Sequence, residues 1–297
     1  MQWSPLTIQL IRAAFDEDMG AAGDVSGSLL ANSQPTHARL VARSAGVVSG
    51  LALVPEILTQ FAARGARGPI TFQPAPDARD GAAISAGARI GELHGPCADL
   101  LAIERTLLNF VGRLCGVATL TADYVGAARR GAPHVQVLDT RKTLPGWREL
   151  DKYAVRCGGG TNHRFGLWDA VLLKDNHLAG LSVHNLPEAV GAWLASLSER
   201  RTELKFVEVE VDSLAQFAAL VAVPGIDILL LDNFSIDDLR AAVRLRDERG
   251  LRGRLLLEAS GGITLTTIAQ IAQTGVDRVS VGAITHSAPV LDVALDF

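Results

Sequence analysis

Cysteine is scarce in this chain of 297 residues, and the few cysteines form no recognisable pattern. Cys97, Cys115 and Cys157 are odd in number and show neither a CxxC motif nor a Cys/His ligand spacing. This argues against a disulfide framework and against a structural zinc site. We expect them to be buried or half-buried thiols in a reducing compartment.

Excess positive charge and long hydrophobic runs are also missing. Lys and Arg total 28 against 32 Asp and Glu, a net charge of -4, whereas general nucleic-acid binding needs a basic surface. The most apolar stretch, 214–231, contains Gln216, Pro224, Gly225 and Asp227, so it is too interrupted for a membrane span. The chain also opens with no basic leader before an apolar run. We therefore expect a cytoplasmic protein with no nucleic-acid and no membrane partner.

The composition is otherwise that of a globular protein, with 48% hydrophobic and 20% charged residues. The length predicts about two domains, or one domain with a barrel-sized core. The first third of the chain mixes helices and short strands. Within it, periodic apolar residues over about 97–130 predict one long helix that ends or breaks near residues 112–116, where glycines occur.

From residue 134 onward, short apolar runs alternate regularly with helix-like segments. Alternating strands and helices are typical of βαβ units and a parallel sheet. Six strands are strong and a seventh is marginal, so an open, incomplete β/α barrel fits better than a closed eight-stranded one. The expected strands are 135–140, 170–176, 206–211, 227–233, 255–262 and 278–283, and the expected helices are 147–157, 186–201, 213–223, 235–249 and 264–274.

Polar residues stand at the end of every one of these strands. A single charged residue at a strand end is usually a solvated turn residue. In a β/α barrel, however, the carboxyl ends of all strands meet at one face, which holds the active site. Six such ends therefore predict a site. They carry Asp139 to Lys142, Lys174 to His177, Glu208 with Glu210, Asp232 with Asn233, Glu258 with Ser260 to Gly262, and Gly282 with nearby His286.

The charges divide this predicted site into two ends. Segment 139–174 has seven basic residues against four acidic ones, in a chain that is acidic overall. Arg164 follows a Gly-rich loop and offers a planar fork for a carboxylate or phosphate. Glu210 and Asp232, at the other end, suit Mg²⁺ or ribose hydroxyls. Together with glycine-rich turns after the last two strands, this pattern indicates a phosphorylated sugar as substrate.

The motifs resemble those of the quinolinate phosphoribosyltransferase family, also called nicotinate-nucleotide pyrophosphorylase (carboxylating). The resemblance is carried by LDTRKTLPGWRELDKYAVRCGGGTNHRFGLWDAVLLKDNH (138–177), VEVEVDS (207–213), LLLDNF (229–234), EASGGI (258–263) and DRVSVGAITHSAP (277–289). Shorter matches, GDVSG (23–27), ERTLLNF (104–110) and CGVAT (115–119), extend it over nearly the whole chain.

The resemblance implies a pentosyltransferase of NAD biosynthesis that uses Mg²⁺. Such an enzyme makes nicotinate mononucleotide, pyrophosphate and CO₂ from quinolinate and 5-phosphoribosyl-1-pyrophosphate. The implied fold is an N-terminal α/β sandwich over 1–116, with the tail 287–297 packing back on it, and an open β/α barrel over 117–286. The implied assembly is a homodimer in which Arg105 completes the neighbour's site, and it leaves open whether dimers assemble further.

The resemblance also assigns roles to individual residues. Arg105, Arg141, His163, Arg164 and Lys174 would meet the quinolinate carboxylates, and Thr140 would lie beside them. Lys142, Glu210 and Asp232 would be catalytic and would serve ribose and pyrophosphate, with Glu210 and Asp232 holding Mg²⁺ through water or through the phosphoribosyl substrate. Ser260, Gly261, Gly262, Val281, Gly282 and Ala283 would hold the 5-phosphate, with His286 close by.

Three alternatives remain open from the sequence. A related phosphoribosyltransferase-like protein of metal-transport operons shares the fold, but it usually lacks the full GGGxNHRxGLxDxxLxKDNH run that is complete here. A β/α-barrel lyase would use Lys174 as a Schiff base, which needs a desolvated lysine. A non-catalytic protein that kept the fold is disfavoured because unused buried charges cost stability.

Overall fold

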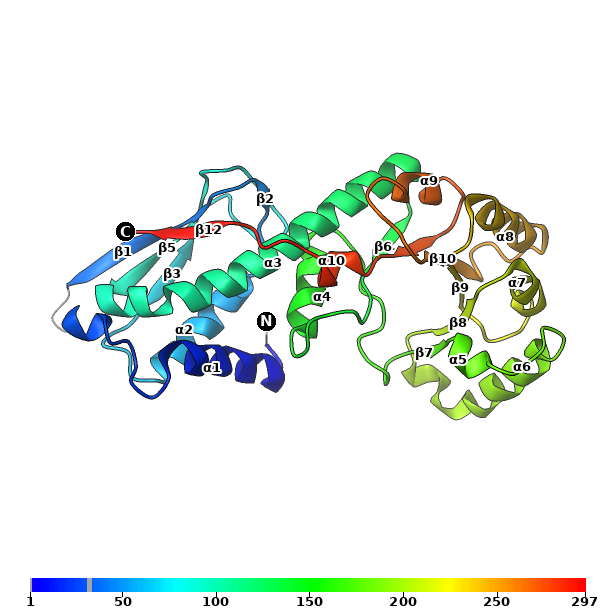
Figure 1. The fold of residues 1–297 in the computed structure, drawn as a ribbon, viewed down its shortest axis with the longest axis horizontal. Helices are drawn as coiled ribbons and strands as arrows, with labels where there is room; N and C mark the ends of the chain where they lie inside the picture. Colours follow the sequence, from blue (N-terminus) through cyan, green and yellow to red (C-terminus); the bar gives the residue numbers. More distant parts are fainter. Residues whose placement is uncertain (1, 31–33) are drawn as a thin grey trace. The chain divides into compact units, whose positions relative to one another are not determined.

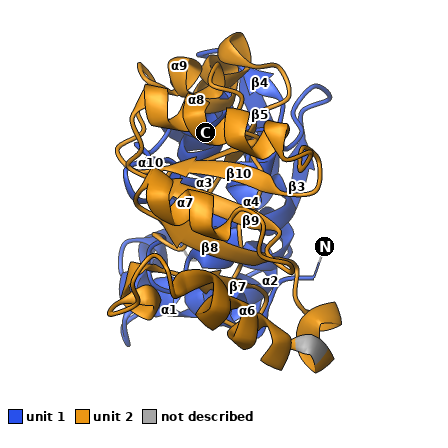
Figure 2. Cartoon of the chain, turned by 90° about the vertical axis from the view of Figure 1, so that its right-hand side faces the viewer, with its two compact units in different colours: residues 1–122, 143–159, 283–297 blue, residues 123–142, 160–282 orange. Residues whose placement is uncertain are grey.

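The structure is a computed structural model that describes residues 2–30 and 34–297. It divides into two compact units (Figure 2). Unit 1 comprises Met1–Ala122, Thr143–Gly159 and Ala283–Phe297, and unit 2 comprises Asp123–Lys142 and Gly160–Gly282. Residues 1 and 31–33, which fall in the expected N-terminal domain, lie outside the described part. Residues 143–159, which follow the first barrel strand and were expected in the barrel domain, belong to unit 1.

Unit 1 is built on a four-stranded antiparallel sheet with the strand order β12-β1-β5-β3. A two-stranded ladder, β2 with β4, completes its strands. The last strand of the chain returns to pair with the first, for example Leu40 with Leu295, so the C-terminal tail belongs to this sheet (Figure 1). The strand bounds are β1 Pro35–Ala42, β2 Gly46–Val47, β3 Thr71–Pro74, β4 Ala83–Ile84, β5 Arg89–Pro96 and β12 Val293–Asp296.

The helices of unit 1 begin where the local sequence favours it. Ser4 caps α1 by accepting a hydrogen bond from Thr7 N, and a proline follows at the first helical position. Phe15 of α1 packs on Phe61 of α2 with ring centroids 5.6 Å apart. The helices are α1 Pro5–Met19, η1 Gly27–Leu30, η2 Leu51–Leu53, α2 Val54–Ala62, α4 Arg148–Cys157 and α10 Ala283–His286, together with the first part of α3.

The long helix α3 runs unbroken from Cys97 to Gly131, so the expected break near residues 112–116 is wrong. The glycines there allow another segment to approach the helix. A Cβ on Gly112 would lie 2.9 Å from Leu291 O, and one on Gly116 would overlap Pro289 O. Leu291 N donates a 3.0 Å hydrogen bond to Gly112 O. Close packing of the C-terminal segment, rather than a helix end, explains these glycines.

Unit 2 contains six parallel strands in the linear order β6-β11-β10-β9-β8-β7, with β6 and β7 at the two edges. This confirms the expected open, incomplete β/α barrel. The strands are β6 Gln136–Leu138, β7 Val171–Leu173, β8 Val207–Val211, β9 Ile228–Asp232, β10 Leu256–Ser260 and β11 Arg278–Ser280. Each lies within or beside a stretch predicted from the sequence.

Helices follow the strands of unit 2, and Figure 2 shows α7 and α8 over one face of the sheet. Ser213 and Ser235 cap these two helices by accepting hydrogen bonds from Gln216 N and Asp238 N. The helices are α5 Asp175–Leu178, α6 Leu186–Ser196, η3 Ser198–Glu203, α7 Leu214–Leu220, α8 Ile236–Glu248 and α9 Ile268–Ala272.

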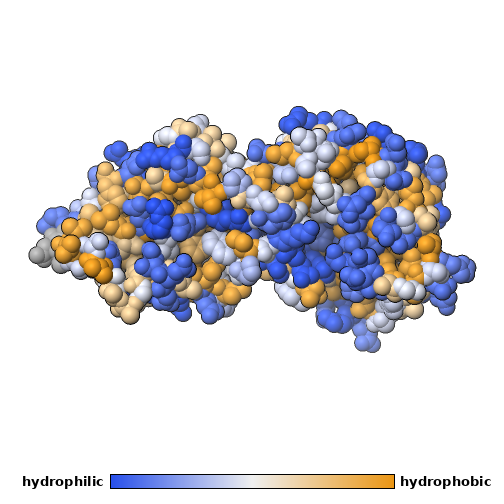
Figure 3. Space-filling model, viewed as in Figure 1, coloured by the Kyte–Doolittle hydropathy of each residue, from blue (hydrophilic) through white to orange (hydrophobic). Residues whose placement is uncertain are grey.

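Hydrophobic and hydrophilic residues are interspersed over the face drawn in Figure 3. None of the helices in the described part of the chain is both long enough and apolar enough to cross a bilayer.

Candidate active site

A cavity of about 280 Å³ in unit 2 gathers the polar residues of the strand ends. Nine of the residues expected at the site line it, and four further residues complete its wall. A larger hollow of about 490 Å³ in unit 1 has no charged side chain among the described residues that line it. The nine are Thr140, Arg141, Lys142, His163, Arg164, Lys174, Glu210, Asp232 and Ser260, and the four are Leu172, Leu230, Glu258 and Ser280.

The two-residue period of a strand explains why these side chains share one cavity. Successive side chains point to opposite faces, so residues two apart lie on the same face. Leu230 and Asp232 of β9 follow this rule, as do Glu258 and Ser260 of β10. The register pairs Ser260 with Asp232 across the two strands, which sets the strand ends level with each other.

Two arginines give the cavity its cationic character. Arg164 is 6% exposed, and burial together with the charge of Arg141 lowers its pKa. No ion pair of Arg141 or Arg164 occurs within the described ranges. Two positive charges near each other attract an anion between them. The arrangement is therefore suited to a carboxylate or phosphate.

Asp139 shapes the loop that carries Arg164. It is fully buried, its Oδ1 accepts a 2.9 Å hydrogen bond from His163 N, and its Oδ2 accepts one of 2.6 Å from Asn162 Nδ2. A bridge between Leu138 and Thr161 joins the same loop to β6. Asp139, expected at a strand end, thus holds the backbone of the loop.

Asp169 holds the far side of this loop. It accepts hydrogen bonds from Phe165 N at 2.7 Å and Gly166 N at 2.9 Å, and it pairs with Lys205 Nζ at 2.8 Å. Burial would raise its pKa, but the bonds to Lys205 and to the two amides outweigh burial and lower it.

Lys174 pairs with Glu210, with 3.1 Å between Nζ and Oε2. The Lys174 side chain is 47% exposed, so it lacks the desolvation that a Schiff-base lysine requires. This geometry does not favour the lyase alternative.

The turn after β10 has the backbone expected of an anion-binding loop. Gly261 has a φ of 93°, and a Cβ there would overlap the side chain of Asn233. Asn233 itself has a φ of 56° and donates from its backbone N to Ser260 O at 2.9 Å. Glycine is therefore required at Gly261 by both conformation and space.

The other residues expected to bind the phosphate lie in different parts of the fold. Val281 N donates a 2.9 Å hydrogen bond to Leu138 O, so this amide serves the sheet. Gly262 and Gly282 follow β10 and β11 closely in the chain. Ala283 and His286 belong to α10 of unit 1, where His286 Nδ1 lies 2.6 Å from Ser287 Oγ. Their contact with a phosphate stays a prediction.

Arg105 also belongs to unit 1, on α3. Its side chain is 64% exposed, and it lies near the acid Glu104, with 3.9 Å between Nη2 and Oε1. An exposed arginine with such a distant partner can reach another molecule, but its role at a neighbour's site stays a prediction.

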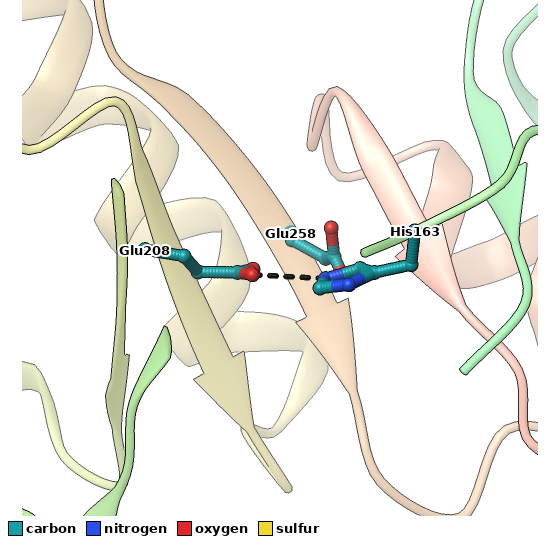
Figure 4. Close-up of side chains that lie close together, drawn as sticks. All are labelled: His163, Glu208 and Glu258. Atoms are coloured by element: carbon teal, nitrogen blue, oxygen red, sulfur yellow. Dashed lines mark ion pairs between the residues drawn. The ribbon is translucent and has the colours of Figure 1, made fainter. Parts of the chain in front are cut away.

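Glu208 and Glu258, expected at strand ends, form a buried charged layer beneath His163 whose pairing the sequence did not predict (Figure 4). Nε2 of His163 lies 2.8 Å from Glu208 Oε2 and 3.4 Å from Glu258 Oε1, and Glu258 Oε2 lies 2.9 Å from Arg278 Nε. Both glutamates are fully buried. The sequence did carry one signal. Glu208 and Arg278 lie two residues before Glu210 and Ser280, which line the cavity, so each shares a strand face with a lining residue.

The charges of this layer balance only with one added proton. Burial and the charge of Glu258 raise the pKa of Glu208 to about 7, whereas the bonds from His163 and the charge of Arg278 outweigh burial and lower the pKa of Glu258. Burial lowers the pKa of His163, but both carboxylates raise it more. Arg164 N, however, donates to His163 Nδ1 at 2.8 Å, which opposes a proton on that nitrogen.

His163, Glu208 and Glu258 also offer three ligand atoms within 4.8 Å of one another, as many as a catalytic zinc site uses. Each of them already has an N–H or cationic partner, and Arg278 would repel a metal ion bound by Glu258. We assign the three residues to an ion-pair network. Glu210 and Asp232, which line the open cavity, are the better candidates for a cation.

Comparison with known proteins identifies the family of this chain. The profile described as "Quinolinate phosphoribosyl transferase, N-terminal domain" matches residues 24–115, and that of the C-terminal domain matches residues 117–296. The chain is 39% identical to the nicotinate-nucleotide pyrophosphorylase [carboxylating] of Mycobacterium leprae over 96% of this chain and 95% of that protein. It is 36% identical to a probable nicotinate-nucleotide pyrophosphorylase [carboxylating] of Bacillus subtilis, over 97% of this chain and 92% of that protein.

Solved structures give the same result for the fold. The crystal structure of NadC from Streptococcus pyogenes is 37% identical, with a TM-score of 0.83 over 100% of this chain and 98% of that one. The nicotinate-nucleotide pyrophosphorylase from Francisella tularensis is 35% identical, with a TM-score of 0.84 over 100% of this chain and 97% of that one. The chain belongs to the quinolinate phosphoribosyl transferase family.

Proposed function

We propose that this protein transfers the phosphoribosyl group of 5-phosphoribosyl-1-pyrophosphate to quinolinate, with loss of CO₂. The products are nicotinate mononucleotide and pyrophosphate, and the reaction feeds NAD biosynthesis. Membership of the family supports this assignment, as do the names of the relatives.

One observation carries the proposal: Arg141 and Arg164 face one cavity without a carboxylate partner in the described part of the chain. Quinolinate has two adjacent carboxylates and can bridge two such cations. Lys174 lines the same cavity and supplies a third positive charge. Arg105 of the neighbouring subunit would be a fourth in a homodimer. His163, which the resemblance puts in this set, has its ring nitrogens engaged by Glu208 and Arg164 N.

Ribosyl transfer passes through an oxocarbenium-like centre, as in glycoside chemistry. Glu210 and Asp232 line the cavity from neighbouring strands, and their carboxylates would stabilise the positive charge on the ribose. Lys142 would neutralise the departing pyrophosphate, and Thr140, which accepts a 3.0 Å hydrogen bond from Lys142 N, shapes the turn that presents it. Once the ring nitrogen is alkylated, its positive charge stabilises the electron pair that stays on the neighbouring ring carbon when the C–C bond to the carboxylate breaks. The carboxylate leaves as CO₂, and the ring carbon takes a proton from water.

Mg²⁺ fits this donor set. It prefers oxygen ligands, keeps several waters, and is typically held by one or two carboxylates together with substrate phosphates. Glu210 and Asp232 are the cavity carboxylates that would hold it, and Asp232 is oriented by a 2.8 Å hydrogen bond from Asn233 Nδ2. When bound, Mg²⁺ would offset the negative charge of the pyrophosphate.

The 5-phosphate would bind at the turns after β10 and β11. Ser260, Gly261 and Gly262 form the first turn, and the positive φ angles of the two glycines let their amides face an anion. Val281, Gly282 and Ala283 form the second turn, with His286 beyond it. We place the working enzyme in the cytoplasm as a homodimer, with no nucleic-acid partner.

The test is incubation of the protein with quinolinate, 5-phosphoribosyl-1-pyrophosphate and Mg²⁺. Nicotinate mononucleotide and CO₂ should form in equal amounts, and both should disappear when Mg²⁺ is chelated. A folded preparation that releases neither product would refute the assignment.

A further inference from the structure

Two large apolar side chains stand next to each other on the loop of unit 2 that carries Arg164. Leu167 is 73% exposed and Trp168 is 72% exposed. The loop holds them in place, because Asp169 accepts hydrogen bonds from two of its backbone amides. The indole also packs on Gly166, where a Cβ would lie 2.6 Å from Nε1 of Trp168. Tryptophan is enriched at protein interfaces and among the residues that contribute most to binding, so this loop has the character of a contact with a partner.

Unit 1 contains a groove that matches such a pair of side chains. A hollow of about 340 Å³, which we call the α1/α3 groove, is lined by residues of unit 1. Leu10, Ala13 and Ala14 of α1 contribute apolar surface, and Phe110 of α3 stacks on Trp147 with ring centroids 4.9 Å apart. Small side chains on the helix and two aromatic rings give an apolar ring from a partner both space and surface to pack against.

The α1/α3 groove also contains the residue that is proposed to cross between subunits. Arg105 lines it. In the proposed homodimer Arg105 reaches the quinolinate cavity of the neighbour, which Arg164 of that neighbour lines. Trp168 lies four residues after Arg164, at most about 14 Å along an extended chain. The contact that brings Arg105 to the neighbour's cavity therefore brings the groove within reach of the neighbour's loop.

Charge and hydrogen bonding favour the same pairing. Glu17 and Asp18 are exposed, line the α1/α3 groove, and form no ion pair with another described residue. The loop belongs to segment 139–174, which has seven basic residues against four acidic ones. The indole N–H of Trp168 has no hydrogen-bond acceptor in the part of the chain that the structure describes, and a carboxylate of the groove can accept from it.

We propose that Leu167 and Trp168 of one subunit insert into the α1/α3 groove of a second copy of this chain, beside the Arg105 that completes the first subunit's site. In a two-fold dimer the contact occurs twice. The inference rests on the proposed function, since it concerns how the shared site is assembled. Insertion would fix α3 of one subunit against the substrate loop of the other, and so hold Arg105 at the cavity.

Dimer dissociation tests the contact from both sides. Trp168→Ala removes the inserted ring, and Ala13→Glu puts a charge into the groove. Both positions are exposed within one chain, so the monomer should fold. Each variant should raise the dimer dissociation constant at least about tenfold in analytical ultracentrifugation. Specific activity should fall when either variant is diluted and recover at high protein concentration, because the shared sites reassemble.

The matched controls make the same two changes on α6. Trp193→Ala removes a tryptophan that is 39% exposed, and Ala192→Glu adds a charge at an exposed helical position. Neither residue lies in the loop or lines the α1/α3 groove. Both controls should leave the dissociation constant unchanged. A dimeric wild-type protein whose dissociation constant changes with neither Trp168→Ala nor Ala13→Glu would overturn the proposal.

Cross-linking tests the contact directly. Trp168→Cys and Ala13→Cys are prepared separately, mixed at a concentration where both are dimeric, and treated with a short thiol-reactive cross-linker. A covalent dimer should form in the mixture, and a link within one chain cannot produce it. Each variant alone is the control for the native cysteines. A mixture with verified subunit exchange that gives no more covalent dimer than the single variants would show that the loop docks elsewhere.

The proposed interface and the proposed reaction fail in different ways. A wild-type dimer whose cysteine variants cross-link as expected, but which forms no nicotinate mononucleotide, refutes the reaction and keeps the interface. A wild-type protein that forms nicotinate mononucleotide as a monomer refutes the interface and keeps the reaction.

Discussion

Lys174 Nζ lies 3.1 Å from Glu210 Oε2, which pairs a cation of the proposed quinolinate end with a carboxylate of the proposed ribosyl end. Lys174 is about half exposed, so solvent screens the pair and it contributes little to stability by itself. A carboxylate of quinolinate can therefore compete with Glu210 for Lys174. The two residues should nonetheless give different kinetic phenotypes.

Arg164→Ala and Lys174→Ala should each raise the KM for quinolinate by at least about an order of magnitude. Glu210→Ala and Asp232→Ala should act mainly on kcat, because their carboxylates serve a charge that develops only in the transition state. Steady-state kinetics with each substrate varied in turn will separate the two classes. Equal effects of all four variants on KM alone would remove the distinction. Arg240→Ala on α8, which is paired with Asp237, is the surface control and should leave both constants unchanged.

Quinolinate should react, and nicotinate should not react appreciably. Nicotinate lacks one carboxylate, so one member of the cationic set would stay unpaired in the complex. Truncating one partner of such a charge pair costs roughly 2–5 kcal/mol. Competing turnover of the two acids in one assay measures the preference. Comparable rates at equal concentrations would contradict the dicarboxylate site.

Asp169 should stabilise the fold in a pH-dependent way. Its pKa is lowered from the ordinary 3.8, so its contribution is present above that pH and is lost as pH falls through the lowered value. Asp169→Asn should reduce the free energy of unfolding by roughly 1.5–3 kcal/mol near pH 7, the range for hydrogen bonds to a charged group. Urea denaturation of the wild-type protein and of Asp169→Asn at several pH values measures the difference between their free energies of unfolding. This difference should narrow below about pH 4. A gap that does not change with pH would mean that the charge plays no part.

Two glycines of α3 should respond to alanine in opposite ways. A Cβ on Gly116 would overlap Pro289 O, so Gly116→Ala should destabilise the protein by roughly 1–3 kcal/mol through overpacking. A Cβ on Gly126 would meet no other segment of the described chain within 4 Å, so Gly126→Ala should stabilise the helix by roughly 0.5–1 kcal/mol. Thermal unfolding of both variants shows whether each substitution lowers or raises the stability of the protein. Similar shifts for both would show that helix propensity alone governs these positions.

Arg105 should complete the site of the neighbouring subunit in the proposed homodimer. At a quinolinate concentration well below the raised KM, Arg105→Ala and Lys174→Ala should each show almost no activity alone. In a mixed dimer one site pairs the intact Lys174 with the intact Arg105, while the other site carries both lesions. Random mixing makes about half of the dimers mixed, so roughly a quarter of normal activity should return. No recovery after verified subunit exchange would place Arg105 in its own chain's site or outside any site.

Much of unit 2 could be read from the sequence because its signals are local. Apolar runs bounded by turn residues predict strands, and a polar strand end is visible without knowing what lies beside it. Glu210, Asp232 and Ser260 were identified in this way, and all three line the cavity. The parallel arrangement then follows from the alternation of strands and helices. Local pattern was thus enough to predict an open β/α barrel with a charged site at its strand ends.

Only the tertiary structure decided which residues meet beneath that site. His163, Glu208, Glu258 and Arg278 come from a loop and three strands, and their contacts depend on the strand order β11-β10-β9-β8. The same holds for α3, where glycines read as a break until the C-terminal segment is seen to lie against them. Spacing along the chain sets which face a side chain occupies, but strand order and packing set its neighbours. For this reason the sequence determined the fold and the wall of the cavity, and the tertiary structure decided how the buried charges beneath it are paired.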